Sequence, residues 1–476
     1  MLPLNNLLDK YLNEVCSFIK CKSIHNDIKE ELKSHIDELS ECYIVKGFSE
    51  NDALSRAIAE MGSSADVGRK INDQHKPQTN WTMILLTSII AIIGIAIMYV
   101  SSNFEGHHAV NFERHLFFVV IGFCLLGTMY FFDYSKLKKY PYHFLVFGFL
   151  VFILTLFSGT YVNGSIRYFR IGSLYLPSII SSSGLICLSS IIGFSGLIDR
   201  YKASGGIGIL KLIIIGGMTF IPLVMFPDIS TAFVLLLSYA VILLVAVTRG
   251  NFGGNKKVQI LSLVGIGVLF VLIPITIMIV TSPYRLQRII SFFEGGYNDP
   301  QGYGWVMVMA DKLLAASNWV GEANPIAEGT VSNVMPGLTS EYVLLNIITH
   351  FGIIAGIVLI GVVALLIVKM FVTSSKIKND FGFYISMMAS TYLAAQFILN
   401  ILMNFNLVPS SSYTLPFVSY GGSAFIVNMI FVGIILSVWR RNNIITKDKG
   451  FPMNKVNKFL KIEDGKVILD FRARTR

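Results

Sequence analysis

Charged residues are scarce in this chain, which separates it from ordinary soluble proteins. Only 14% of its 476 residues are Asp, Glu, Lys or Arg, whereas 53% are hydrophobic. Mean hydropathy is +0.63, far more apolar than a soluble fold of this length requires. The composition therefore predicts a membrane protein.

Cysteine is also scarce, and its placement argues against redox or metal chemistry. The chain has five cysteines, and none forms a CxxC pair or a His/Cys cluster with metal-ligand spacing. We therefore expect structural thiols and no metal site built from the chain's own side chains.

Long apolar runs, in contrast, are abundant. A helix needs about 20 apolar residues to cross roughly 30 Å of hydrocarbon, and ten runs approach or exceed that length. The first begins at residue 82, behind a polar segment, so we expect no cleavable signal peptide. The sequence predicts an all-α polytopic membrane protein. The ten predicted helices lie near 82–101, 115–133, 142–158, 178–198, 209–226, 228–248, 259–282, 342–368, 383–403 and 415–438.

Basic residues are distributed unevenly between the predicted loops. Alternate loops carry clusters of lysine and arginine, whereas the other loops are longer and contain fewer of them. Because cytoplasmic loops are enriched in basic residues, both termini are predicted to be cytoplasmic. The net charge of +10 fits this topology and attraction to an anionic inner leaflet. The sequence contains no nucleic-acid-binding motif, so we expect no nucleic-acid partner.

Residues 1–76 differ sharply from the rest of the chain. "HNDIKEELKSHIDELSECYIVKG" has apolar positions at helical spacing and ends on Gly47, a typical helix terminator. A second helix is predicted after the N-cap residue Ser49, and a third near Ser64. We predict a small soluble helical domain with a docking or regulatory role, followed by a linker at 77–81.

The C-terminal segment, 441–476, is a basic cytoplasmic tail. Within it, "KIEDGKVILDF" places Asp464 and Gly465 between two apolar runs, a pattern that favours a small hairpin. The sequence assigns this tail no function.

One predicted outward loop is exceptionally long. Residues 283–341 separate the seventh and eighth helices and contain Arg285, Arg288, several aromatic residues and several glycines. Loops of this length in compact proteins are usually functional or disordered. The aromatic residues favour an ordered element that is partly embedded in the membrane.

The stretch "TLPFVSYGGSAFIVNM" opens the tenth predicted helix. It contains Pro416, Ser419 and Tyr420, followed by Gly421 and Gly422. Paired glycines let another backbone approach closely, as small residues do between membrane helices. By itself, this stretch indicates a packing motif.

Two shorter motifs allow a structural and a functional interpretation. "MFPDISTAF" places Pro227 and Asp228 where the sixth helix begins, so Asp228 is either an N-cap or a residue that faces substrate. "NGSIRYFRIG" presents Arg167 and Arg170 on an outward loop. Two cations beside aromatic residues suit a phosphate headgroup, but interfacial snorkelling explains them equally well.

Two ionisable residues occur near the start of the eighth predicted helix. "PGLTSEYVLLNIITHFG" begins at Pro336 and places Glu341 where the loop enters the helix. His350 then lies about 13 Å inside that helix by its rise per residue. Ionisable groups at membrane depth are candidates for function, although a histidine bonded to a neighbouring helix is the more common case.

Taken together, these motifs resemble one known family. The chain from about 82 to 440 is similar to the SEDS proteins (shape, elongation, division and sporulation), the FtsW/RodA/SpoVE group. "LPFVSYGGSA" resembles the family's signature in helix ten, "FPDISTA" its Pro-Asp motif, and "NGSIRYFRIG" its Arg-Trp loop. The resemblance implies ten membrane helices, cytoplasmic termini and a bacterial plasma-membrane location. Residues 1–76 are similar to the helical prefix domain of some Gram-positive permease-like proteins.

The resemblance also implies an activity. Family members polymerise lipid II with an outward aspartate that follows a threonine and precedes a phenylalanine. When the chain is aligned on Pro336 and Gly352, that motif falls on Ser340, Glu341 and Tyr342. Glu341 would then be the general base that removes a proton from a sugar hydroxyl.

The remaining expectations concern substrate and partners. The resemblance implies that Arg167, Asp228, Arg285, Arg288 and Ser419, together with Ser340, line the substrate cavity. Arginines or a divalent cation, Mg or Mn, can stabilise the pyrophosphate leaving group. The expected partner is a single-pass class B penicillin-binding protein. Division, elongation or sporulation proteins could bind through the N-terminal domain.

Several departures from the family pattern keep alternatives open. Polar positions of the long loop have become Val306, Met309 and Ala310, and two acidic positions of helix eight have become Thr349 and His350. These changes favour either a different lipid-linked sugar or an inactive paralogue that scaffolds a wall-synthesis complex. A lipid-linked precursor flippase is a third and weaker hypothesis, because few polar residues could line a path through the helices.

Overall fold

The structure of the protein is a computed structural model of the whole chain. Two compact units make up the chain: residues 1–78 with 441–476, and residues 79–440. The described residues are 4–20, 22, 25–74, 76–102, 110–162, 165–169, 181–226, 228–265, 267–268, 283–299, 301–326, 335–443, 460–463 and 466–469.

The N-terminal unit contains four helices. Three were predicted, including α3, whose N-cap Ser49 accepts a hydrogen bond from the Asp52 backbone N–H. The prediction missed α1, an amphipathic helix whose Leu12 and Val15 are buried in the same core as Ile36 of α2. The helices are α1 (Leu4–Ser17), α2 (His25–Val45), α3 (Glu50–Met61) and α4 (Ser64–Gln74).

The C-terminal tail contains the predicted hairpin. Strands β3 (Leu460–Glu463) and β4 (Lys466–Leu469) pair antiparallel, with Glu463 opposite Lys466. This pairing confirms the two strands. The turn residues themselves lie outside the described part of the chain.

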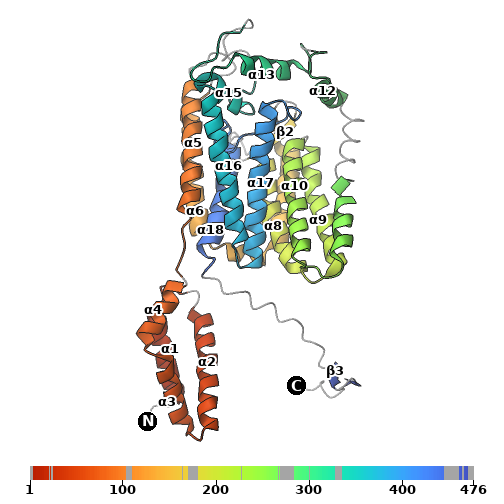
Figure 1. Cartoon of the computed structure of the whole chain (residues 1–476). Helices are drawn as coiled ribbons and strands as arrows, with labels where there is room; N and C mark the ends of the chain where they lie inside the picture. Colours follow the sequence, from red (N-terminus) through yellow and green to blue (C-terminus); the bar gives the residue numbers. More distant parts are fainter. Residues whose placement is uncertain are drawn as a thin grey trace. The chain divides into compact units, whose positions relative to one another are not determined.

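The larger unit is a bundle of membrane helices (Figure 1). Within the described residues, nine helices are long and apolar enough to span a bilayer. The predicted seventh helix, 259–282, falls mostly outside those residues. The nine are α5 (Trp81–Ser101), α6 (Phe112–Phe131), α7 (Pro141–Ser158), α8 (Ser182–Tyr201), α9 (Gly205–Met225), α10 (Ile229–Thr248), α16 (Ile353–Ser375), α17 (Asp380–Asn404) and α18 (Gly422–Arg440).

Helix α8 lies at the centre of the bundle. Its most apolar stretch is 89% buried, compared with 28% for that of α7. Small residues explain this position, because a Cβ added at Gly193 would come within 2.8 Å of the Pro141 carbonyl oxygen of α7. Close approach at small residues drives helix association in membranes, where lipid is as apolar as the side chains.

The eighth predicted helix, 342–368, is divided, which corrects the prediction of one continuous helix. Helix α15 (Val343–Phe351) ends at Gly352, and α16 begins at the next residue. Gly352 has φ 95° and ψ 166°, a conformation that is essentially restricted to glycine. The segment 318–320 stabilises the break, since the carbonyls of Asn318 and Trp319 accept hydrogen bonds from the first backbone N–H groups of α16.

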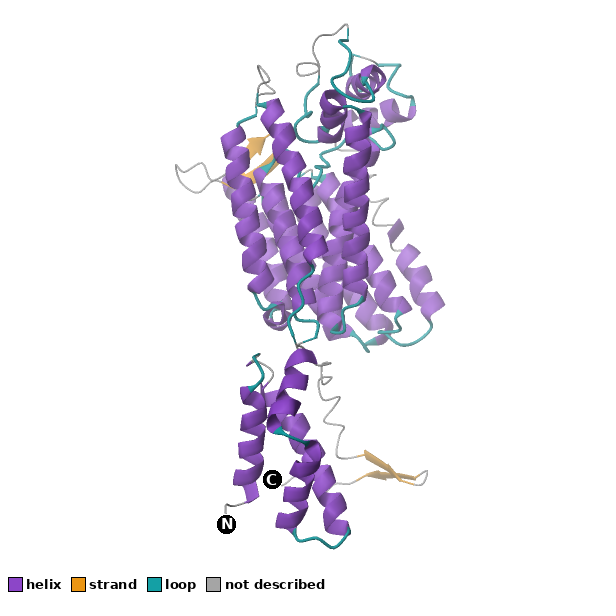
Figure 2. Cartoon of the chain, turned by 60° about the vertical axis from the view of Figure 1, so that its left-hand side comes forward, coloured by secondary structure: helices purple, strands orange, loops and turns teal. Residues whose placement is uncertain are grey.

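Several short elements gather at one end of the bundle, called the loop end below. They include α12 (Pro283–Phe293), α13 (Trp305–Ala316) and α15, which lie beyond the spanning helices in Figure 1. The hairpin of β1 (Gly159–Val162) and β2 (Ser165–Phe169) lies at the same end in Figure 2. The described part of the predicted long loop therefore forms helices and turns over the end of the bundle.

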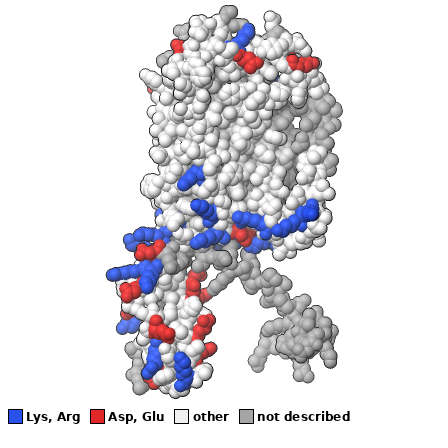
Figure 3. Space-filling model, in the orientation of Figure 1, with Lys and Arg blue, Asp and Glu red and all other residues white. Residues whose placement is uncertain are grey.

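The opposite end of the bundle carries the positive charge. On the face shown in Figure 3, Lys and Arg form a band at this end. Part of the charge is neutralised there, because Asp199 of α8 pairs with Lys138 and Lys202, each at 3.0 Å. Lys202 also bonds Asp380 of α17 at 2.8 Å. These ion pairs join α8, α17 and the 3-10 helix Tyr134–Lys139.

Candidate active site

A tight turn at residues 336–342 presents Glu341 at the loop end. Gly337 adopts φ 80°, and its carbonyl accepts hydrogen bonds from the backbone N–H groups of Ser340 (3.0 Å) and Tyr342 (2.8 Å). The positive φ needs glycine, because a side chain there would be strained. Pro336, a predicted structural residue, begins the turn and is exposed.

Three successive carbonyls of this turn are hydrogen bonded to neighbouring elements. The Thr339 carbonyl accepts from the Tyr420 N–H at 2.7 Å, and the Ser340 carbonyl accepts from the Ser419 hydroxyl at 2.6 Å. The Glu341 carbonyl accepts from two amides of α17. The bonds are 2.7 Å from Asn400 Nδ2 and 3.1 Å from Asn404 Nδ2. The backbone of Glu341 is therefore fixed on both sides.

The Glu341 carboxylate is half-buried and has one hydrogen-bond donor beside it. The Ser340 hydroxyl donates to Glu341 Oε2. A Cβ placed on Gly337 would lie 2.9 Å from the same oxygen. Glycine at position 337 thus leaves the space that this carboxylate occupies.

The signature stretch before α18 is not helical, which corrects the predicted start of the tenth helix at 415. Residues 416–420 form turns and bends, and α18 begins at Gly422. Pro416 is buried, Phe417 has φ 67°, and the Ser419 hydroxyl accepts from the Leu415 N–H at 2.8 Å. These bonds fold the segment into a turn, and the Ser419 hydroxyl and Tyr420 N–H of this segment reach the Glu341 turn.

The two glycines of that stretch do not act as predicted. A Cβ on Gly422 would meet the Phe118 ring of α6 at 2.3 Å, whereas a Cβ on Gly421 would meet nothing within 4 Å. The close backbone approach is instead at Gly94 of α5, 2.7 Å from the Phe417 carbonyl oxygen. A ring, and not a backbone, therefore packs on Gly422.

Asp228 lies deeper, as the N-cap of α10. It is 9% exposed, and its carboxylate accepts from the Thr231 N–H at 3.3 Å, which is the structural alternative stated from sequence. The neighbouring Pro227 lies outside the described residues. Asp228 lies near Tyr413, whose pKa is raised to about 12 by burial and, to a smaller extent, by that carboxylate. Asp228 therefore belongs to the layer beneath the Glu341 turn.

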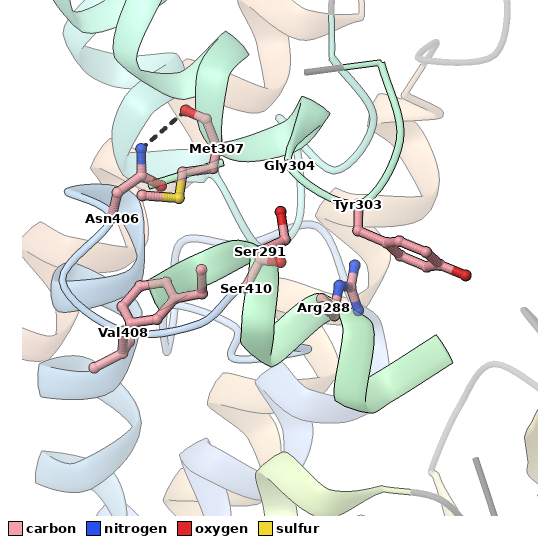
Figure 4. A pocket seen from close by; sticks show the side chains of 9 residues that line it. Arg288, Ser291, Tyr303, Gly304, Met307, Asn406, Val408 and Ser410 are labelled. Carbon is pink, nitrogen blue, oxygen red and sulfur yellow. Dashed lines mark hydrogen bonds between the residues drawn. The ribbon is translucent and has the colours of Figure 1, made fainter. Parts of the chain in front are cut away.

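The predicted arginines are only partly placed by the structure. Arg288 lies on α12 and lines a small recess with Ser291 and Tyr303 (Figure 4). Arg167 belongs to β2 and Arg285 to α12. The side chains of Arg167 and Arg285, and all of Arg170, lie outside what the structure describes.

His350 does not lie inside a membrane helix as predicted. It is at the end of α15, two residues before the break at Gly352, and its Nδ1 lies 3.0 Å from the Asn346 carbonyl oxygen. His350 thus lies in the short helix α15 and not in the spanning helix α16.

The described residues contain no group of three or more His, Cys, Asp or Glu side chains that could hold a metal ion. Their side chains thus do not make a protein-held cage for Mg or Mn. Glu341 is a single carboxylate, and a cation there would need substrate phosphates as its other ligands.

Sequence reasoning missed how Asn400 and Asn404 act on the turn. Both are almost fully buried in α17, and Asn404 Oδ1 also accepts from the Leu345 N–H of α15 at 3.0 Å. The available signal was their spacing, since two amides four residues apart in an apolar helix share one face. Buried polar groups in a membrane helix need partners, and here the partner is the Glu341 backbone.

The fold and this site define a multi-pass helical membrane protein with a glutamate whose backbone is hydrogen bonded on both sides at one end of the bundle. Residues 77–444 match the family model FtsW/RodA/SpoVE, described as "Cell cycle protein". The chain therefore belongs to this family, the SEDS proteins.

Individual relatives agree with the family. The chain is 26% identical over 377 residues to a "Probable peptidoglycan glycosyltransferase FtsW" of Coxiella burnetii, covering 75% of this chain and 95% of that one. The corresponding protein of Pseudoalteromonas translucida is 26% identical over 342 residues, covering 70% and 81%.

Solved structures share the fold. One, described as "Structural coordination of polymerization and crosslinking by a peptidoglycan synthase complex", matches with a TM-score of 0.60 and 20% identity. It covers 76% of this chain and 98% of that chain. A mutant of the Rod shape determining protein RodA of Thermus thermophilus matches with a TM-score of 0.54 and 17% identity, covering 76% and 98%.

Proposed function

We propose that this protein is a peptidoglycan glycosyltransferase that polymerises lipid II, with Glu341 as its general base. The observation that carries the proposal is the fixed backbone of Glu341, whose carbonyl is bonded by Asn400 and Asn404. A catalytic group must be held close to its productive position, because a displacement of about 1 Å can cost on the order of a hundredfold in rate. The curated relatives carry the name of this activity.

The chemistry assigned to Glu341 is removal of one proton. The acceptor sugar hydroxyl attacks the anomeric carbon of the donor sugar and gives its proton to the Glu341 carboxylate. A glycosidic C–O bond forms, the bond between that carbon and the phosphate oxygen breaks, and the lipid diphosphate leaves with the electron pair. The Ser340 hydroxyl, which donates to Glu341 Oε2, orients the carboxylate for this transfer.

Positive charge must stabilise the departing diphosphate. Arg288 is the described side chain best placed to do so, since it lines the recess beside Tyr342. We assign Arg167 and Arg285 the same task by family resemblance. A Mg or Mn ion would enter with the phosphates of the substrate.

The proposal sets the orientation of the protein. The loop end, which carries Glu341, would face outward, and both termini would lie in the cytoplasm. The band of basic residues at the opposite end supports this orientation (Figure 3), because positive residues favour the cytoplasmic side. The membrane would be the bacterial plasma membrane.

We also propose a partner. A single-pass class B penicillin-binding protein would cross-link the glycan that this chain makes, and a structural relative comes from a complex described by polymerization and crosslinking. The N-terminal unit would bind division, elongation or sporulation proteins.

A second candidate function is a non-catalytic scaffold of a wall-synthesis complex. It is favoured by the apolar packing beneath the site, where Met309 and Ala310 lie in one buried cluster with Leu338 and Tyr342. A polar substrate gains no hydrogen bonds from these side chains.

Purified full-length protein supplied with labelled lipid II decides between the two candidates. Glycan product that disappears in Glu341→Gln supports the enzyme. The absence of product with the wild-type chain, with each penicillin-binding partner and with Mg or Mn, would support the scaffold.

A further inference from the structure

Two tyrosines join neighbouring helices at the basic end of the bundle, the end opposite Glu341. Tyr142, in the first turn of α7, and Tyr201, the last residue of α8, are hydrogen bonded through their hydroxyl oxygens at 2.5 Å. Tyrosine is enriched where a membrane meets water, because its ring is apolar and its hydroxyl is polar. The pair therefore lies at the level expected for lipid headgroups.

A basic side chain lies over each of the two rings. The Arg200 guanidinium carbon is 5.3 Å from the centroid of the Tyr142 ring. On the other side, Lys211 Nζ is 5.4 Å from the centroid of the Tyr201 ring. Both distances are within the roughly 6 Å of a cation–π contact. Two rings and two cations from α7, α8 and α9 thus form one group, called the tyrosine–cation cluster below.

The two cations of the cluster have no carboxylate of their own. Among the residues that the structure describes, neither Arg200 nor Lys211 forms an ion pair. The acidic residue nearest to them in sequence, Asp199, is buried and already pairs with Lys138 and Lys202. The cluster therefore carries two positive charges that can attract an anion.

Lys211 lies where a charge without an anion is unfavourable. It is six residues beyond the first residue of α9, about 9 Å into the helix by its rise per residue. Ile207 and Ile214 share its face at spacings of four and three residues, and they are 67% and 55% exposed. Exposed apolar side chains on a spanning helix face lipid. A lysine on this face is costly unless its ammonium reaches polar groups, and a lipid phosphate would supply them.

The tyrosine pair also keeps one hydroxyl hydrogen available. Each hydroxyl has one hydrogen, and the bond between the two oxygens uses only one of the two. The other hydrogen can be donated to a ligand, which can reach the pair because Tyr142 is 39% exposed. Arg200 and Lys211 both act electrostatically on Tyr142. One hydroxyl donor and two cations therefore converge on the same place.

We propose that the tyrosine–cation cluster binds the phosphodiester headgroup of an anionic phospholipid, with Arg200 and Lys211 supplying the charge and the tyrosine pair donating one hydrogen bond. Guanidinium, ammonium and hydroxyl donors together suit phosphate oxygens, which accept several bonds at once. The exposed apolar side chains of α9 beside the cluster favour a lipid over a free anion, because acyl chains pack on them. In the proposed orientation the lipid belongs to the cytoplasmic leaflet, and its binding is independent of the reaction at Glu341.

Native mass spectrometry of the full-length protein in mild detergent tests this site by counting the lipids that stay bound. Detergent removes the bilayer and its surface potential, so general attraction to an anionic leaflet no longer contributes. In a titration, phosphatidylglycerol should bind with a Kd at least about tenfold lower than that of phosphatidylcholine, which has no net charge. That ratio is the effect of about one charge-assisted hydrogen bond.

Three variants remove the proposed contacts one kind at a time. Arg200→Gln and Lys211→Gln each remove one charge and keep most of the side-chain length. The double variant Tyr142→Phe/Tyr201→Phe keeps both rings and both cations but removes the donated hydrogen. Each of the three should raise the Kd for phosphatidylglycerol by about tenfold, the effect of losing one hydrogen bond to a charged group.

Lys256→Gln is the matched control for these variants. Lys256 is an exposed lysine at the same end of the bundle, but its ammonium donates to the Thr248 carbonyl at 2.9 Å. The substitution removes the same charge without touching the cluster, so the Kd for phosphatidylglycerol should stay within twofold of wild type.

Three results would overturn the assignment. Phosphatidylcholine that binds as tightly as phosphatidylglycerol would show that the headgroup charge is not recognised. An equal loss of affinity in Lys256→Gln and Lys211→Gln would show diffuse attraction in place of a site. Glycerol 1-phosphate that competes as strongly as the lipid would place a free anion in the cluster. If a variant is less stable, the Tm of the wild-type protein decides, because a bound ligand raises it: a rise with phosphatidylglycerol alone supports the site, and equal rises with both lipids refute it.

Discussion

At the scale of single residues, the backbone of Glu341 is hydrogen bonded more fully than its side chain. Its carbonyl has two amide donors, so the position of the residue is set by α17. Its carboxylate has the Ser340 hydroxyl beside it. A glutamate reaches one methylene further than an aspartate. The carboxylate therefore depends on this neighbour for its direction more than a shorter side chain would.

Replacing Ser340 with alanine tests that dependence. We expect kcat for lipid II polymerisation to fall by about tenfold, because the carboxylate gains freedom to leave its productive direction. Threonine keeps the hydroxyl and should restore most of the rate. Steady-state kinetics of the two variants provide the comparison, and equal rates for Ser340→Ala and Ser340→Thr would show that the hydroxyl has no part in the reaction.

The amides that hold the turn give a second test. Asn400→Leu and Asn404→Leu preserve side-chain size but leave the Glu341 carbonyl without one of its donors. We expect kcat to fall by roughly 10- to 100-fold with a smaller change in KM, since the base is displaced. The matched control is Asn428→Leu, because Asn428 is equally buried but bonds Gln396 instead.

The control Asn428→Leu separates an effect on protein stability from an effect on the position of Glu341. Asn428→Leu should lower the Tm without a comparable loss of kcat. If all three variants lose activity in proportion to their Tm, Asn400 and Asn404 act only on stability.

At the scale of elements, the break between α15 and α16 shapes the loop end. It turns what reads as one apolar helix into a short helix above the bundle and a spanning helix. The first N–H groups of α16, which would otherwise lack partners, bond carbonyls of the segment 318–320. The break therefore ties the long loop to the bundle next to the site.

Gly352→Ala should disrupt this arrangement. Alanine is strained at φ 95°, and its Cβ would lie 2.6 Å from the Trp319 carbonyl oxygen. We expect a loss of at least about 2 kcal/mol, seen as a Tm lower by several degrees in thermal unfolding. Gly361→Ala in the same element is the control, because its Cβ meets nothing within 4 Å. It should leave the Tm unchanged or raised, and equal effects at both positions would contradict the account.

These elements also show how far the sequence could predict the structure. The spanning helices were predictable because each is a long apolar run bounded by polar residues. Gly352 was not recognised as a break, since a glycine in an apolar run is ordinary and only its tertiary contacts decide its conformation. Helix α1 was missed because its short amphipathic pattern becomes stable only against α2 and α4.

The site was also predictable in part, because its motifs can be recognised in the sequence. The motif that contains Glu341 and the signature stretch with Ser419 are both visible in the sequence, and the structure brings them into contact. The hydrogen bonds from Asn400 and Asn404 to the Glu341 carbonyl could not be predicted, because they depend on how α17 packs against the turn. Apolar pattern and motif thus predict which segments matter, and three-dimensional contacts decide what each side chain does.

At the scale of the whole molecule, the two ends of the bundle perform different tasks. The loop end holds the candidate site. The other end is stabilised by Asp199, which is 6% exposed and pairs with both Lys138 and Lys202. Burial lowers the pKa of Lys202, but its hydrogen bonds to Asp380 and Asp199 outweigh burial and raise it overall.

The sign of that shift predicts a pH dependence. A lysine whose pKa is raised on folding stabilises the protein fully below its unfolded pKa of about 10.4, and the gain is lost as pH rises through the higher folded value. Asp199→Asn should therefore lower the Tm equally at pH 7 and pH 9, by more than Asp380→Asn does, since Asp199 is the buried partner. If Asp199→Asn lowers the Tm at pH 7 but not at pH 9, the assignment is wrong.

The most direct test of the central claim is the rate of lipid II polymerisation by full-length protein with the charge at position 341 removed. Glu341→Gln should reduce kcat by at least about 100-fold, the usual contribution of a general base. Glu341→Asp should keep measurable activity because it keeps the carboxylate. Glu322→Gln, at an exposed position of the same loop, should match wild type. Equal rates for Glu341→Gln and wild type, or no polymer from wild type under any condition, would contradict the account.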